Sequence, residues 1–164
     1  MYDEIMKASF PYEIRWARHQ EWETAMRLVW RTFLKFEGDV YSECGIKKFH
    51  EFITDKNLQS AFVRGEYQVL VAIDGRRIIG VASIRDRNHL SLLFVDEHYH
   101  KRGVGRNLLE YLFRYLKEEV GERFITLKAS PYAVGFYRKL GFRIVTPEQQ
   151  YSGIRVTAME RFFY

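Results

Sequence analysis

The chain has 164 residues, of which 47% are hydrophobic and 29% are charged, and both fractions are close to the averages for soluble globular proteins. This composition excludes a disordered chain, a collagen-like repeat and a disulfide-rich scaffold, and the length predicts one domain over residues 1–164. Lys and Arg number 26 against 21 Asp and Glu, a net charge of +5, which indicates an anionic partner without identifying it.

The single cysteine and the N-terminal segment give information about the cellular compartment of the protein. Cys44 cannot form an internal disulfide, so nothing in the sequence indicates an oxidising environment. Residues 1–11 carry charges with no apolar run behind them, unlike a signal peptide. No stretch approaches the roughly 18 consecutive apolar residues of a membrane span. We therefore expect a cytoplasmic protein that does not enter a membrane.

Helical patterns dominate the first third of the chain. A short strand is predicted over Tyr12–Arg18, and apolar residues then recur at helical spacing from Trp22 to Phe36, with Gly38 as a typical end. A second, weaker helix is predicted from its N-cap, Ser42, to Ile53. Two helices therefore separate the first strand from the following ones.

The hydrophobic period then changes to that of strands. Residues 67–73 and 77–84 are rich in β-formers, and Asp74-Gly75-Arg76 between them predicts a hairpin turn. Residues 89–95 are apolar almost without interruption, which is typical of a central strand covered on both faces. These segments predict three consecutive strands.

The strongest helical pattern spans Val104–Val120, where apolar residues repeat every four positions until Gly121. A strand is predicted over 124–129. A short helix follows, with Ser130 as its N-cap, Pro131 as its first residue and Gly141 at its end. Two strands are then predicted over 142–145 and 154–162, with a polar loop between them. This element order favours an α/β protein, a mixed sheet with helices on its faces.

The main chemical signal is the turn His100-Lys101-Arg102-Gly103-Val104-Gly105 between the apolar strand and the long helix. A helix N-terminus presents unpaired N–H groups, glycines allow close backbone approach, and nearby Lys and Arg add charge, so this turn suits a phosphate. A dinucleotide fold would need a glycine where Leu108 stands, and a P-loop would need Gly-Lys-Ser/Thr. Neither is present, and a tight turn with ordinary capping is the alternative.

Two motifs carry a resemblance to the GCN5-related N-acetyltransferase (GNAT) superfamily. The turn His100–Gly105 resembles motif A, Arg/Gln-x-x-Gly-x-Gly/Ala after a buried strand, with His100 in place of the usual Arg or Gln. The segment Ser130–Phe142 resembles motif B, roughly Asn-x-x-Ala-x-x-Phe-Tyr-x-Lys-x-Gly-Phe. Motif A alone is moderately specific. The two motifs in this order, with an element order that fits over residues 12–162, extend the resemblance to nearly the whole chain.

The resemblance implies a fold and a co-substrate. It implies a mostly antiparallel sheet of roughly six to seven strands, helices on both faces, and a V-shaped gap beside the strand before motif A. Acetyl-CoA would lie in this gap, with its pantetheine amides paired to the backbone of Phe94 and Val95, and no metal is expected. The diphosphate would sit on the N–H groups of Arg102, Gly103, Val104, Gly105 and Arg106, in the turn that also holds His100 and Lys101.

The resemblance also implies catalytic residues. Tyr137 would protonate or hydrogen-bond the departing CoA thiolate, because a phenol is a donor at neutral pH; the alternative is one more packed helix aromatic. Ser130 either contacts the pantetheine arm or caps the helix. His89 opens the central strand where histone-acetyltransferase-like members carry a catalytic Glu, and it is the predicted general base, with a structural histidine and a water chain as the alternative. Further candidates for the base are Asp86, Glu97 and His98.

These features together predict an N-acetyltransferase that moves an acetyl group from acetyl-CoA to a primary amine within a ternary complex. The alternative is a non-catalytic acyl-CoA-binding sensor or interaction module. Nucleic acid is disfavoured as a partner, because an aromatic residue is absent after Gly103. The acceptor stays open between a small molecule, a peptide and a protein lysine, and the terminal strand could pair in a homodimer. Acidic residues that could suit a cationic amine are Glu37, Asp39 and Glu43.

Overall fold

The structure is a computed structural model that describes residues 10–151 and 153–164, so most of the segment compared above with a signal peptide lies outside it. Within those ranges, no helix combines the length and apolarity needed to cross a bilayer. The strands are β1 (Glu13–Trp16), β2 (Gln68–Asp74), β3 (Arg77–Arg85), β4 (His89–Val95), β5 (Phe124–Ala129), β6 (Arg143–Ile144), β7 (Gln149–Tyr151) and β8 (Ile154–Phe162). The helices are α2 (Trp22–Glu37), α3 (Glu43–Ile53), α4 (Lys56–Val63), α5 (Val104–Arg114, continued by a wider π turn over Tyr115–Val120) and α6 (Val134–Lys139).

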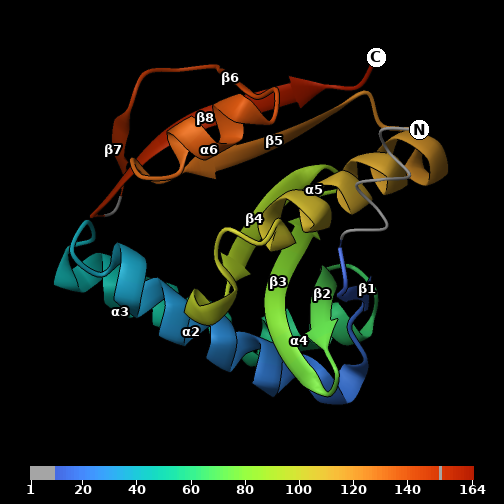
Figure 1. Ribbon diagram of the computed structural model, residues 1–164. Helices are drawn as coiled ribbons and strands as arrows, with labels where there is room; N and C mark the ends of the chain where they lie inside the picture. Colours follow the sequence, from blue (N-terminus) through green and yellow to red (C-terminus); the bar gives the residue numbers. More distant parts are fainter. Residues whose placement is uncertain (1–9, 152) are drawn as a thin grey trace.

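The strands form one sheet in the order β1-β2-β3-β4-β5-β8-β6, and β7 pairs with β8 (Figure 1). Every pair is antiparallel except the parallel pair β4 and β5. The parallel pair requires a crossover, and the long helix α5 supplies it. The predicted α/β fold with a mostly antiparallel sheet is confirmed.

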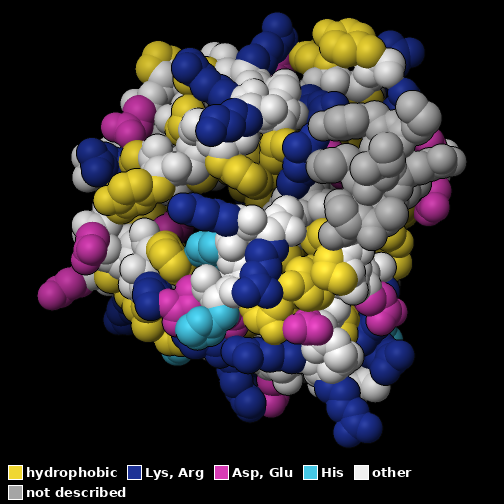
Figure 2. Space-filling view, viewed as in Figure 1, with side chains coloured by type: hydrophobic (Ala, Val, Ile, Leu, Met, Phe, Trp, Pro, Cys, Tyr) yellow, Lys and Arg dark blue, Asp and Glu magenta, His cyan; other side chains and the backbone are white. Residues whose placement is uncertain are grey.

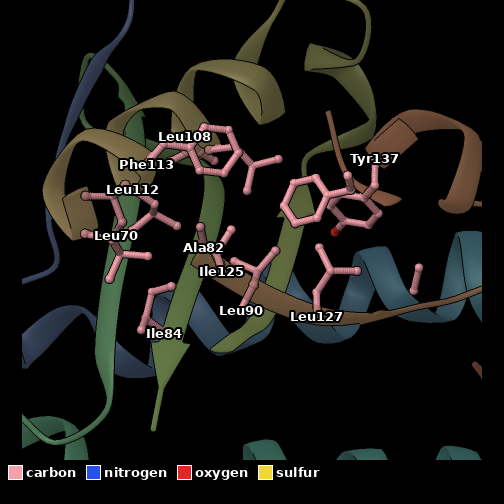
Figure 3. Packing of buried hydrophobic residues seen from close by; sticks show 14 of the residues in the cluster. Leu70, Ala82, Ile84, Leu90, Leu108, Leu112, Phe113, Ile125, Leu127 and Tyr137 are labelled. Atoms are coloured by element: carbon pink, nitrogen blue, oxygen red, sulfur yellow. The ribbon is translucent and has the colours of Figure 1, made fainter. Parts of the chain in front are cut away.

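Two clusters of buried side chains hold helices on opposite faces of the sheet. Side chains alternate between the faces of a strand, so Leu70 and Ala72 of β2 pack with α5, whereas Val69 and Val71 pack with α2. Figure 3 shows the cluster under α5, where Leu108 faces the strands. The central strands are therefore covered on both sides, which explains why their sequences are almost continuously apolar.

The parallel pair β4 and β5 is joined only at one end. His89 pairs with Thr126 and Leu90 with Leu127, and beyond Leu90 the described residues form no further rung between these strands. Figure 1 shows β5, β6 and β8, with α6, leaning away from the half that contains β1 to β4. This is the predicted V-shaped gap, and it leaves the edge of β4 open over residues 91–95.

Gly80 of β3 lets α5 begin close to the sheet. A Cβ atom on Gly80 would lie 2.8 Å from Cγ1 of Val104 and 3.0 Å from Cδ1 of Leu108. Both separations are shorter than ordinary carbon contacts, so a side chain here would push the start of α5 away from β3. The glycine thus fixes the height of the helix N-terminus above the gap.

Three local features differ from the predictions. Helix α4 was not predicted, because Phe62 is its one buried residue and the apolar period is correspondingly weak. Strand β7 lies inside the predicted polar loop, where exposed residues are held to β8 by backbone pairing alone. The predicted N-cap at Ser130 is wrong, because α6 begins at Val134 with Ala133 as its N-cap. The predicted cap at Ser42 is confirmed by its 3.0 Å hydrogen bond from the Gly45 N–H.

Candidate active site

The turn before α5 is shaped by two residues in the left-handed region. Lys101 has φ 62° and Gly103 has φ 80°, a conformation that a side chain makes costly and that explains a glycine at position 103. Asn107 braces the turn, because its N–H and its Nδ2 both donate to the Gly103 carbonyl, at 2.9 and 2.7 Å. The first N–H groups of α5 have no acceptor within the helix. They are therefore free to bind an anion.

A cavity of about 470 Å³ adjoins this turn. It runs between the start of α5, the open edge of β4, the end of α2 and helix α6, and Figure 2 shows Lys and Arg side chains around a hollow on this face. A Cβ atom on Gly105 would lie 3.4 Å from Cζ of Phe136 and 3.7 Å from Cγ2 of Val95, so a larger side chain would enter the cavity. The predicted residues on its wall are Phe94, Val95, His100, Lys101, Gly103, Val104, Gly105, Arg106 and Tyr137.

The side chains of His100 and Arg102 have structural partners outside the turn. The His100 ring donates from Nε2 to the Val95 carbonyl at 2.7 Å and lies 4.8 Å from the ring of Phe36. The Arg102 guanidinium donates to the Tyr12 hydroxyl at 3.0 Å and lies over the Tyr99 ring at 5.2 Å. His100 thus ties the turn to the end of β4, whereas the Arg102 side chain points away from the cavity and leaves only its backbone near the anion site.

The open edge of β4 presents the backbone groups of alternate residues. The Asp96 N–H donates to the Ile79 carbonyl of the neighbouring β3 at 2.8 Å, and antiparallel strands direct successive residues' backbone groups to opposite edges. The N–H and C=O groups of Val95 and Leu93 therefore face the gap, while those of Phe94 face β3. The geometry selects Leu93 beside the predicted Val95 for pairing with a ligand in the gap, and Phe94 contributes its side chain.

A second cavity, of about 110 Å³, lies deeper between β4, β5 and the end of α2. It meets the first cavity at Glu37, Leu93, Phe94, Ala133 and Tyr137, which line both. Leucines of β4 contribute to the wall of the second cavity, together with the hydroxyls of Ser91 and Ser130 and the side chain of Lys128. The two cavities therefore adjoin; we call them together the passage, and we call the place where Tyr137 lines both its corner.

Tyr137 is buried at this corner, with 7% of its surface exposed. Figure 3 shows its ring descending from α6 at the end of the apolar cluster, above Leu127. Burial, and to a smaller extent the charge of Glu37, raises the pKa of Tyr137 above its ordinary value. The phenol therefore keeps its proton at neutral pH and can act as a hydrogen-bond donor toward the passage.

Ser130 and Glu37 form a pair that the sequence did not reveal. The Ser130 hydroxyl donates to Glu37 Oε1 at 2.9 Å, so Ser130 orients this carboxylate instead of capping α6. Burial raises the pKa of Glu37, and the Ser130 hydrogen bond opposes this shift. Glu37 was one of three acidic residues predicted to suit a cationic amine, and only its position at the corner distinguishes it.

His89 lies at the closed end of the gap. Its Nδ1 is 2.8 Å from Thr126 Oγ1, across the β4–β5 pair, and it lines neither cavity. Burial, together with the charges of Arg85 and Lys128, lowers the pKa of His89 to about 4. The ring is therefore neutral at physiological pH, but it does not lie beside Tyr137 on the passage.

Comparison with known proteins matches this arrangement to a family. The acetyltransferase (GNAT) domain family matches residues 37–162, most of the chain. This chain belongs to the GNAT acetyltransferases. A Bacillus subtilis (strain 168) protein that carries the name of an acetyltransferase is 28% identical over 138 residues, which cover 82% of this chain and 85% of that protein.

Solved GNAT structures share the fold at low sequence identity. A GCN5-related N-acetyltransferase from Rhodopseudomonas palustris superposes with a TM-score of 0.79 at 21% identity, covering 92% of this GNAT chain and 95% of the other. The PaiA N-acetyltransferase from Thermoplasma acidophilum, solved in complex with coenzyme A, has a TM-score of 0.76 at 20% identity, covering 93% and 99%. The predicted GNAT resemblance is confirmed.

Asp96 anchors the segment between β4 and the glycine turn in this GNAT protein. Its side chain is almost fully buried and accepts hydrogen bonds from Arg31 at 3.0 Å, Arg77 at 3.4 Å and the His98 N–H at 2.9 Å. Burial alone would raise the pKa of Asp96, but the His98 N–H and the two arginines outweigh it and hold the pKa below the ordinary value of 3.8. The carboxylate links α2, β3 and the turn.

Replacing Asp96 by Asn is expected to lower the free energy of unfolding by about 1–3 kcal/mol at pH 7, because two guanidinium groups lose a charged acceptor. Urea denaturation measures this difference. Because the pKa is lowered on folding, the stabilisation is complete above the unfolded value of 3.8 and is lost as the pH falls through the folded value. Equal stability of the two proteins at pH 7 would contradict the anchoring role.

Proposed function

We propose that this GNAT acetyltransferase transfers an acetyl group from acetyl-CoA to a primary amine within a ternary complex. One observation carries the proposal: a passage runs from the anion-binding start of α5, along the open edge of β4, to the Tyr137 side chain. The relative from Thermoplasma acidophilum, which shares the fold, binds coenzyme A. The order of features along the passage matches a diphosphate, an amide-bearing arm and a thioester.

The residues along this passage fit acetyl-CoA. The free N–H groups at residues 104–106 and the side chains of Lys101 and Arg106 suit the diphosphate. Leu93 offers a backbone donor and acceptor and Val95 a backbone donor that β5 does not use, as a strand edge does, while the Val95 carbonyl already accepts from His100. A cavity of about 470 Å³ falls within the usual size range of small-molecule sites.

We assign the steps of the acetyl transfer to a few groups of the chain. When bound, acetyl-CoA supplies a thioester as the activated acyl donor. The Leu93 N–H, which faces the gap where the two cavities meet, is placed to polarise the thioester oxygen as negative charge develops. The Tyr137 hydroxyl donates its proton toward the sulfur, a role that its raised pKa supports by keeping the proton in place.

The test measures both the binding of acetyl-CoA and the transfer of its acetyl group. Acetyl-CoA is expected to raise the melting temperature, and a panel of primary amines is expected to release free thiol, measured with a chromogenic disulfide. Thermal stabilisation without thiol release from any amine would favour the acyl-CoA-binding sensor. The absence of stabilisation would overturn the assignment of the passage to acetyl-CoA.

The role of His89 as general base stays a prediction, and a variant tests it. If His89 takes the amine proton, kcat/KM falls as the pH drops through about 4, where the ring becomes protonated. His89→Ala would then remove this acidic limb. A limb that persists in the variant would assign the proton to another group.

A further inference from the structure

The corner of the passage holds a carboxylate that the steps above do not use. Glu37 ends α2 and lines both cavities together with Tyr137. The hydroxyl of Ser130, 2.9 Å away, is its one protein donor in the described part of the chain. A half-buried carboxylate whose single partner is neutral lacks the cation that usually accompanies buried acidic groups.

The basic side chains of the two cavities lie on either side of this corner, and none of them lines both cavities. The first cavity has Lys101 and Arg106 on its wall and the second has Lys128, whereas Glu37 is the acidic group of both. Phe49 and Leu90 contribute to the wall of the second cavity, but its exposed lining is more polar than apolar, and its one cation, Lys128, lies over the Tyr151 ring at 5.2 Å. A corner with one carboxylate and no lysine or arginine suits the cationic head of a ligand.

Building on the acetyl transfer proposed above, we infer that Glu37 binds the ammonium group of the acceptor in the second cavity and takes its proton. The acceptor is then a small primary amine, because this cavity has a volume of only about 110 Å³. Ser130 is a positioning residue that holds the carboxylate toward Tyr137 through its 2.9 Å hydrogen bond.

Each proton and electron pair in this reaction has a donor and an acceptor at the corner. The ammonium nitrogen gives one proton to Glu37, its freed electron pair forms the C–N bond, and the C–S bond breaks with its pair on sulfur. The second nitrogen proton reaches the sulfur through the Tyr137 hydroxyl, and Glu37 returns its proton to solvent. Burial raises the pKa of Glu37 above its ordinary value of 4.5, which makes it a stronger base than an exposed carboxylate. The other titratable groups on the two cavities are Tyr41, Tyr99, His100, Lys101, Arg106, Lys128 and Tyr137.

The experiment uses protein saturated with CoA and titrates n-butylamine and 2-phenylethylamine by calorimetry, with n-butanol and 2-phenylethanol as uncharged counterparts. The wild-type protein is expected to bind at least one amine at least tenfold more tightly than its alcohol. Glu37→Gln is expected to abolish this preference and to lower the rate of CoA release from acetyl-CoA about 100-fold. Glu51→Gln removes an equal charge from an exposed position on α3 and is expected to change neither.

The outcomes separate this inference from the function on which it rests. An amine preference that survives Glu37→Gln, or its absence in a wild-type protein that binds CoA normally, overturns the role of Glu37 and leaves acetyl-CoA binding intact. Failure of the wild-type protein to bind acetyl-CoA overturns both. If Glu37→Gln does not fold, Glu37→Asp keeps the charge but shortens its reach, and it is expected to weaken amine binding at least fivefold; unchanged binding overturns the inference.

Discussion

Replacing Tyr137 by Phe is expected to lower kcat about 100-fold, the usual contribution of a single general acid, while the Kd for CoA changes by less than about twofold. The phenylalanine ring fills the same volume, and no protein group in the described residues hydrogen-bonds the Tyr137 hydroxyl, so the fold loses no contact. Steady-state kinetics and calorimetry measure the two quantities. The melting temperature is expected to stay within a few degrees of the wild-type value.

Tyr132 supplies the matched control for this substitution. It precedes α6, close to Tyr137 in sequence, but it is 71% exposed and lines neither cavity. Tyr132→Phe removes the same hydroxyl and is expected to leave kcat unchanged. A kcat for Tyr137→Phe equal to that of the wild-type protein would remove Tyr137 as the acid and leave it a packing residue.

Replacing Gly105 by Leu is expected to raise the Kd for CoA at least 100-fold, because the new side chain occupies the space between Val95 and Phe136. A Cβ atom already lies 3.4 Å from Phe136 Cζ and 3.7 Å from Val95 Cγ2, so the remaining carbons extend into the cavity. Gly105 lies within α5 and is not among the residues with positive φ, so leucine is a better helix former there by about 0.5–1 kcal/mol. Affinity is lost while the fold is kept.

Two further glycine variants test the interpretation by calorimetry. Gly105→Ala adds a single carbon at ordinary contact distance and is expected to change the Kd less than about fivefold. Gly135→Leu makes the same change on α6, where a Cβ atom meets nothing within 4 Å, and CoA affinity is expected to be unchanged. Normal CoA binding by Gly105→Leu would contradict the assignment of the diphosphate to this turn.

Local sequence signals predicted most of the fold. The period of four in α5, the hairpin turn between β2 and β3 and the apolar run of β4 each reflect burial along one element, and burial is visible in one segment at a time. Helix α4 and strand β7 were not predicted, because they bury few side chains. Phe62 is the one buried residue of α4, and the exposed residues of β7 are held by backbone pairing.

In the candidate site, too, features that are contiguous in sequence could be predicted, whereas features that depend on packing could not. The glycine turn is contiguous in sequence, so its chemistry was visible there, although the direction of the Arg102 side chain toward Tyr12 was not. The choice between Phe94 and Leu93 depends on strand register, which a sequence does not specify residue by residue. Glu37 and Ser130 are 93 positions apart, and only the packing of α2 against the gap brings them together.

The gap between β4 and β5 also changes what kind of molecule can pair with a strand. An exposed strand edge normally lies at the rim of a sheet, where a second protein chain can add to it and start aggregation. Here the unpaired edge of β4 lies inside the sheet, flanked by the helices that close the passage. Because β5 and β8 continue the sheet beyond this edge, a second protein sheet cannot add to it as it would at the outer rim.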